Sequence, residues 1–128
     1  MAIVVTRYNP DWCNDDQPYA LTPAPSLLSV PLSAEWDDVQ CQWLRQVSPR
    51  DHANLAVAAF GRLHRECAMH QRAAVFGLGL HPWLSGMPSR IAALRSLLAR
   101  LRAYPDVHWT TPDALLQHSP GSTPHGLP

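Results

Sequence analysis

The alternation of apolar and polar positions along the chain predicts strands separated by helices. Short apolar runs typical of strands occupy Ala2–Thr6, Ser26–Leu32, Ala74–Leu80 and Val107–Thr110. Ala74–Leu80 is apolar at both alternating sets of positions, which favours a central strand of a parallel sheet covered on both faces. The pattern therefore predicts an α/β fold in which about four mostly parallel strands alternate with helices.

A helix start is encoded at Ser48–Asp51. This stretch offers a hydroxyl N-cap, a proline at the first helical position, where no amide donor is needed, and an acid in the first turn. We expect the helix to run to about Met69. Residues at three- and four-residue spacing should form its buried stripe, namely Ala56, Phe60, Leu63 and Cys67.

Two more helices are expected later in the chain, and Ser33–Gln46 is expected to be a loop with some helix. One helix should begin at Ser89 and end before Pro105. A short one over Ala114–His118 follows a second cap, proline and acid start. The apolar face of the longer helix should comprise Ile91, Leu94, Leu98 and Leu101.

Composition and charge limit the classes of function. The 128 residues are 46% hydrophobic and 16% charged, which suits one globular domain over residues 1–118, followed by a disordered Pro/Gly/Ser tail over 119–128. Ten acids balance ten basic residues, so we expect no nucleic-acid partner and no membrane partner. Three cysteines without a C-x-x-C pair argue against a disulfide framework and indicate a cytoplasmic protein.

His81 is the first candidate for chemistry. It follows the apolar run Ala74–Leu80, and Pro82 and Gly86-Met87-Pro88 then turn the chain towards a helix. Ligands of parallel α/β proteins bind at the carboxyl ends of strands, and an imidazole titrates near neutrality. His81 is therefore either a general acid or base, or a histidine that only hydrogen-bonds a loop.

An acidic loop is the second candidate. Asp11, Asp15 and Asp16 could bind a metal or orient a base, or they could be solvated turn residues. Trp12 and Tyr19 could line a substrate subsite or simply pack.

Metal and nucleotide motifs are otherwise missing from the sequence. His64 and His70 would lie about 240° apart on a helix, so one metal could not collect both together with Cys67. Asp37-Asp38 is an acid pair without an evident partner. There is no G-x-S-x-G, P-loop or dinucleotide fingerprint.

The segment GLGLHPWLSGMPSRIAALRSLLARL, followed by VHWTTPDAL, resembles the C-terminal part of the polysaccharide deacetylase family. The resembling branch includes chitooligosaccharide and peptidoglycan deacetylases and metal-independent allantoinase-like proteins. The late family motif falls on His81, Pro82, Trp83, Gly86, Pro88 and Arg90. Weaker likenesses place an Asp-rich segment on Asp15, Asp16, Pro18 and Tyr19, and a strand-loop segment near Pro31 and Asp38.

The resemblance covers roughly Tyr8 to Gln117 and implies the C-terminal half of a distorted (β/α)7 barrel. It implies that His81 is catalytic and that substrate is bound by Asp15, Asp16, Tyr19, Trp83 and Arg90. Two family motifs have no counterpart in the sequence: Thr-Phe-Asp-Asp, which supplies the base, and the paired histidines, which bind metal. Met87 also stands where the family usually has arginine.

The resemblance therefore implies a hydrolase of non-peptide C–N bonds, in which His81 protonates the departing nitrogen of an N-acetyl sugar, amide or ureide. We expect the chain to be truncated and inactive alone, to hold no metal or other cofactor, and to self-associate through an exposed sheet edge. A full-length family member could bind a divalent metal. The alternative is a non-catalytic remnant of the fold or an interaction domain.

Overall fold

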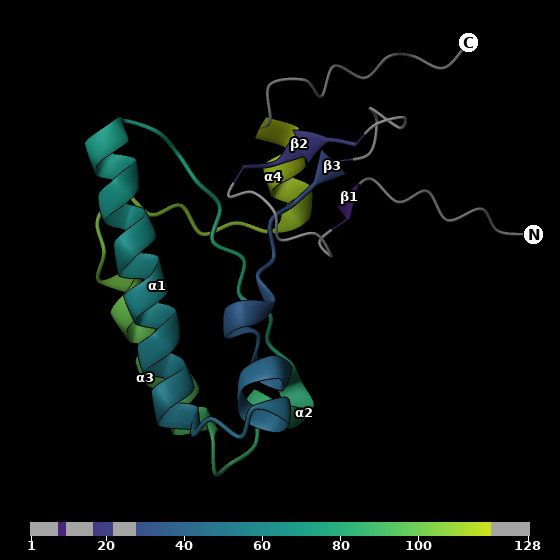
Figure 1. Ribbon diagram of the computed structural model, residues 1–128, viewed down its shortest axis with the longest axis vertical. Coiled ribbons are helices and arrows are strands. Elements are labelled where there is room, and N and C mark those ends of the chain that lie inside the picture. The colour runs from purple at the N-terminus through teal and green to yellow at the C-terminus, as the bar shows by residue number, and fades with distance from the viewer. Residues whose placement is uncertain (1–7, 10–16, 22–27, 119–128) are drawn as a thin grey trace, which may run out of the picture.

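The structure is a computed structural model, and it describes residues 8–9, 17–21 and 28–118. Helices form most of it (Figure 1). The 3₁₀ helix η1 and the π-helix η2 span Ala34–Trp36 and Val39–Leu44, and the α-helices are α1 (Pro49–His70), α2 (Pro82–Ser85), α3 (Ile91–Arg102) and α4 (Pro112–His118). No helix within the described ranges is both long and apolar enough to cross a bilayer.

The expected partial barrel of about four mostly parallel strands is wrong. Three strands of two residues each, β1 (Tyr8–Asn9), β2 (Tyr19–Ala20) and β3 (Leu28–Ser29), form a small sheet of order β1-β3-β2. β1 is parallel to β3, whereas β2 is antiparallel to it. Figure 1 shows this sheet at the end of the molecule away from α2, so it does not support His81 at the start of α2.

Ala74–Leu80, expected to be a central strand, has no regular secondary structure. The segment packs against the residues that follow β3, so closely that a side chain at Gly77 would clash with the carbonyl oxygen of Pro31. Pro31 has no amide hydrogen, so a strand ladder cannot continue there. The segment is instead held by bonds from the Trp36 indole Nε1 to the Gly77 carbonyl (3.0 Å) and from the Asp38 amide to the Gly79 carbonyl (3.2 Å).

The other expected strands fare differently. Val107–Thr110 has no regular structure and its residues are mostly exposed, because no neighbouring strand pairs with it within the described ranges. Of Ser26–Leu32, only Leu28–Ser29 is a strand. Ala2–Thr6 and the tail 119–128 lie outside the described residues.

The helix predicted from Ser48 is confirmed as α1. Ser48 Oγ accepts a hydrogen bond from the Asp51 amide at 3.1 Å, and Pro49 occupies the first helical position. At the other end Gln71 adopts φ 49°, a left-handed C-cap whose amide bonds the Cys67 carbonyl. The cap sequence therefore sets where α1 begins.

The core lies between α1 and α3, which pack side by side (Figure 1). Small residues of α1 allow this close approach, and on α3 the buried leucines are Leu97 and Leu101. Of the residues expected on the two buried faces, only Ala56 and Leu101 are buried. The others are partly buried: Phe60, Leu63, Cys67, Ile91, Leu94 and Leu98. The buried cluster consists of Ala53, Ala56, Val57, Leu97 and Leu101.

Aromatic rings fasten the Ala74–Leu80 segment to this core. Phe76 stacks on Trp36 at 4.8 Å and meets Phe60 of α1 edge to face at 5.3 Å. Such pairs contribute about 0.5–1.5 kcal/mol beyond the area they bury. The segment is therefore held in an extended form without a ladder, and it delivers His81 to a fixed place.

Candidate acid–base site at Asp38 and His81

His81 is the N-cap residue of α2, directly after the extended segment. Its carbonyl accepts bonds from the amides of Leu84 (3.0 Å) and Ser85 (2.9 Å), and Pro82 starts the helical turn. Its own amide donates to Asp38 Oδ2 at 2.8 Å. Both sides of the His81 backbone are thus fixed, which orients its ring.

The Asp38 carboxylate is the buried partner of that ring. Asp38 is 0% exposed, and Oδ1 accepts from His81 Nδ1 at 2.6 Å. Oδ2 accepts from the Ser85 hydroxyl at 2.6 Å as well as from the His81 amide. A buried carboxylate with several donors is expected to remain ionised.

Asp38 and His81 each shift the pKa of the other. Burial alone would raise the pKa of Asp38, but the hydrogen bonds from the His81 amide, Ser85 and the His81 ring outweigh it and lower that pKa. The bond to Asp38 is the main cause that raises the pKa of His81, with smaller help from the charges of Asp38 and Asp37. The pair therefore favours an imidazolium beside a carboxylate.

The geometry also assigns the ring nitrogens of His81. An ionised carboxylate can only accept, so Nδ1 carries the hydrogen that points at Asp38. Nε2 has no hydrogen-bond partner within the part of the chain that the structure describes, and the His81 side chain is 44% exposed. Nε2 is thus the atom that can give a proton to, or take one from, a bound molecule.

Asp37 lies beside this pair without joining it. Its Oδ1 accepts from the Gln40 amide at 3.0 Å at the start of η2, and a side chain at Gly79 would clash with its carboxylate. Asp37, Asp38 and His81 offer ligand atoms within 4.8 Å of one another.

These groups do not fit a divalent cation well. Asp38 already accepts three hydrogen bonds, and the Nδ1 atom of His81 points at a carboxylate rather than at an open position. A metal bound there would have to displace the bonds that hold the site together. The described residues therefore support a hydrogen-bonded pair.

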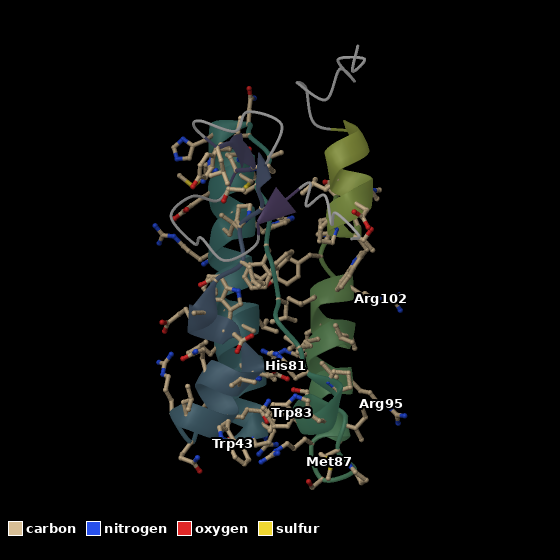
Figure 2. The ribbon with its side chains drawn as sticks, turned by 90° about the vertical axis from the view of Figure 1, so that its right-hand side faces the viewer. Trp43, His81, Trp83, Met87, Arg95 and Arg102 are labelled. Carbon is tan, nitrogen blue, oxygen red and sulfur yellow. The ribbon has the colours of Figure 1, made fainter. Side chains whose placement is uncertain are left out.

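An exposed aromatic surface borders His81. The Trp83 ring lies 5.9 Å from the His81 ring, and Trp43 of η2 meets Trp83 edge to face at 5.9 Å. Figure 2 shows His81, Trp83 and Trp43 on the same side of the molecule, with Met87 nearby. Both tryptophans are more than half exposed, at 56% for Trp43 and 55% for Trp83.

The other residues named from the sequence lie elsewhere. Arg90 precedes α3 and lines a small cavity together with Gln42, His52 and Ser85. Tyr19 lies in β2, at the end of the molecule away from α2 in Figure 1. Asp15 and Asp16 lie outside the described residues. Substrate binding by these four residues stays a prediction.

Sequence reasoning did not identify Asp38 as the partner of His81, and it passed over Ser85. The two members of the pair are 43 residues apart, and no helical or strand spacing links them. The one signal was the weak family likeness near Asp38. Within Asp37-Asp38, only the buried member reaches the imidazole.

The pair should give folding stability a defined pH dependence. A lowered carboxyl pKa contributes stability above its unfolded value of 3.8, and a raised imidazole pKa contributes below its unfolded value of 6.5. We therefore expect the difference in unfolding free energy between wild type and Asp38→Asn to be largest from pH 3.8 to 6.5. It should shrink as pH rises through the raised pKa of His81 or falls through the lowered pKa of Asp38.

Urea unfolding of both proteins at a series of pH values measures this difference. Because the His81 side chain is 44% exposed, solvent should keep the effect modest. A difference that stays constant from about pH 4 to 9 would show that the pair is not formed in solution.

Comparison with known proteins gives a structural match. No known family model matches the chain, and no curated protein matches it. A solved structure, described as the crystal structure of Puue allantoinase, matches with a TM-score of 0.77 and 26% sequence identity. The match covers 88% of this chain and 38% of that chain. The chain is therefore structurally similar to part of an allantoinase, of whose length it spans 38%.

Proposed function

We propose that this chain supplies the acid part of the active site of a hydrolase that cleaves non-peptide C–N bonds, in the manner of the allantoinase-like deacetylases. The observation that carries the proposal is the 2.6 Å bond between Asp38 and His81 Nδ1, which leaves Nε2 as the available ring nitrogen. The structural match to part of an allantoinase supports it. Cyclic ureides and related amides are the favoured substrate class, and N-acetyl sugars are the second.

The chemistry assigned to His81 is protonation of the leaving nitrogen. Water adds to the carbonyl carbon, forms the new C–O bond and gives its proton to a base outside these residues. When the C–N bond breaks, the nitrogen leaves with the electron pair and takes the proton from His81 Nε2. Asp38 keeps the Nδ1 hydrogen in place and stabilises the imidazolium before the transfer, as a carboxylate does for a catalytic histidine elsewhere.

Trp83 is the residue we propose for substrate contact. Its ring borders the imidazole at 5.9 Å, so a planar amide or ureide that reaches Nε2 would meet its face or edge. Trp43 extends the same surface. Neither ring replaces a base, so we propose that turnover also requires polypeptide that supplies one.

A chimera tests the proposal. In the chimera, this chain replaces the 38% of Puue allantoinase that it matches in structure. The rest of the allantoinase chain is kept unchanged. We expect the folded chimera to hydrolyse allantoin, and the isolated chain to hydrolyse neither allantoin nor an N-acetyl sugar. A chimera that folds, as judged by a cooperative melt, yet acts on neither substrate would contradict the proposal.

The exposed apolar surface favours an alternative, a non-catalytic interaction domain that associates with a second copy. Four large apolar side chains around η2 and α2 are at least 46% exposed: Trp43, Leu44, Trp83 and Met87. An inactive chimera combined with concentration-dependent association of the chain in sedimentation would favour this alternative.

A further inference from the structure

Behind the Asp38–His81 pair lies a buried hydrogen-bond chain made of His52, Gln42 and Ser85. It starts in α1, where His52 Nε2 bonds the Trp36 carbonyl at 2.7 Å. His52 Nδ1 then meets Gln42 Nε2 of η2 at 2.9 Å, and the same Gln42 nitrogen lies 3.4 Å from Ser85 Oγ of α2. The Ser85 hydroxyl reaches Asp38 Oδ2.

All three members are buried. His52 is 2% exposed, Gln42 7% and Ser85 3%. This series of hydrogen bonds joins α1, η2 and α2, which are separated in the sequence, and it ends at the Asp38 carboxylate that bonds His81. Buried polar groups of this kind specify one arrangement when their donors and acceptors match.

The donors and acceptors permit a single direction of hydrogen-bond donation between His52 and Asp38. A carbonyl can only accept, so His52 Nε2 carries the hydrogen, and His52 Nδ1 accepts from the Gln42 amide nitrogen. Gln42 therefore presents its amide nitrogen, whose second hydrogen points at Ser85 Oγ. With its oxygen accepting there, the Ser85 hydroxyl turns its own hydrogen to Asp38.

We propose that His52, Gln42 and Ser85 are positioning residues for His81: through this one-way hydrogen-bond chain they fix Asp38 as an acceptor and thereby keep the His81 proton on Nδ1 and Nε2 towards the substrate. This inference rests on the proposed function, because it concerns the same catalytic atom. Within the described residues, the Gln42 amide nitrogen lies within hydrogen-bond distance of both His52 and Ser85, whereas Gln42 Oε1 has no hydrogen-bond partner. The orientation of the Gln42 amide group is therefore set by the two acceptors of its nitrogen, His52 Nδ1 and Ser85 Oγ.

The test reads the tautomer of His81 directly in the isolated 128-residue chain, by long-range ¹H–¹⁵N NMR above the pKa of the ring. His52→Phe keeps the ring volume but removes the acceptor for Gln42, and Gln42→Met keeps the length but removes both donors. Val57→Ala is the matched control, since it creates a defect in the same buried face of α1 outside the hydrogen-bond chain. Asp38→Asn serves as the reference for a lost pair.

We expect each of the two network variants to change the ratio of Nδ1–H to Nε2–H His81 by at least about threefold, a modest coupling for residues in one hydrogen-bond network. Val57→Ala should lower the melting temperature without changing that ratio. If His52→Phe does not fold, Gln42→Met alone decides. A wild-type ratio in the network variants, with a changed ratio in Asp38→Asn, overturns the positioning role but leaves the proposed function intact. An unchanged ratio in Asp38→Asn overturns both.

Discussion

His81→Ala in the allantoinase chimera is expected to lower turnover by about 10²-fold or more, because a positioned general acid contributes on that order. The Michaelis constant should change little, since the proton is transferred only in the transition state. Steady-state hydrolysis of allantoin measures both constants. The loss should also be smaller for a substrate whose leaving nitrogen is less basic, because that nitrogen needs less help to depart.

His108→Ala is the matched control for this experiment. His108 is an exposed histidine outside the site, so its replacement should leave turnover unchanged. Equal turnover in His81→Ala and His108→Ala would mean that His81 only fastens the start of α2. In that case the Asp38–His81 pair would be a structural feature.

Leu97→Ala should cause the largest loss of stability, about 2–5 kcal/mol of unfolding free energy. Leu97 is 1% exposed and faces the small residues Ala53 and Ala56 of α1, which have no side-chain length with which to fill the space. For a small domain this is a large share of the total stability. Urea denaturation at fixed pH measures the change.

Leu44→Ala is the control for the core experiment. Leu44 is 61% exposed, and surface substitutions of this kind usually change stability by about 0.5 kcal/mol or less. If Leu97→Ala costs no more than Leu44→Ala, the packing of α3 on α1 does not hold in solution.

The helices could be predicted from sequence because their signals are local. Ser48 caps α1 within three residues of Asp51, and the apolar spacing of α1 and α3 repeats within each helix. The strand at Ala74–Leu80 could not be judged this way, because a strand exists only where a neighbour pairs with it. At Gly77, where a neighbouring strand would pair, the segment instead contacts the Pro31 carbonyl and accepts a hydrogen bond from the Trp36 indole.

In the candidate site too, the sequence indicates the residue with a local signal but not the residues that only folding brings to it. His81 could be singled out from its place after an apolar run and before a turn, and the structure gives it a buried acidic partner. Asp38 could not be connected to His81 or to Ser85, because folding brings it to them across 43 and 47 residues of sequence. Gln42 and His52 carry no motif at all, and only their burial marks them.

The central claim is that Asp38 holds His81 as an acid whose Nε2 is available, and an NMR titration of His81 in the isolated chain tests it most directly. For the wild type we predict a midpoint above 6.5, with Nδ1 carrying the proton of the neutral ring. For Asp38→Asn the midpoint should fall and the proton should move to Nε2. The same midpoint and the same tautomer in both proteins would contradict the account.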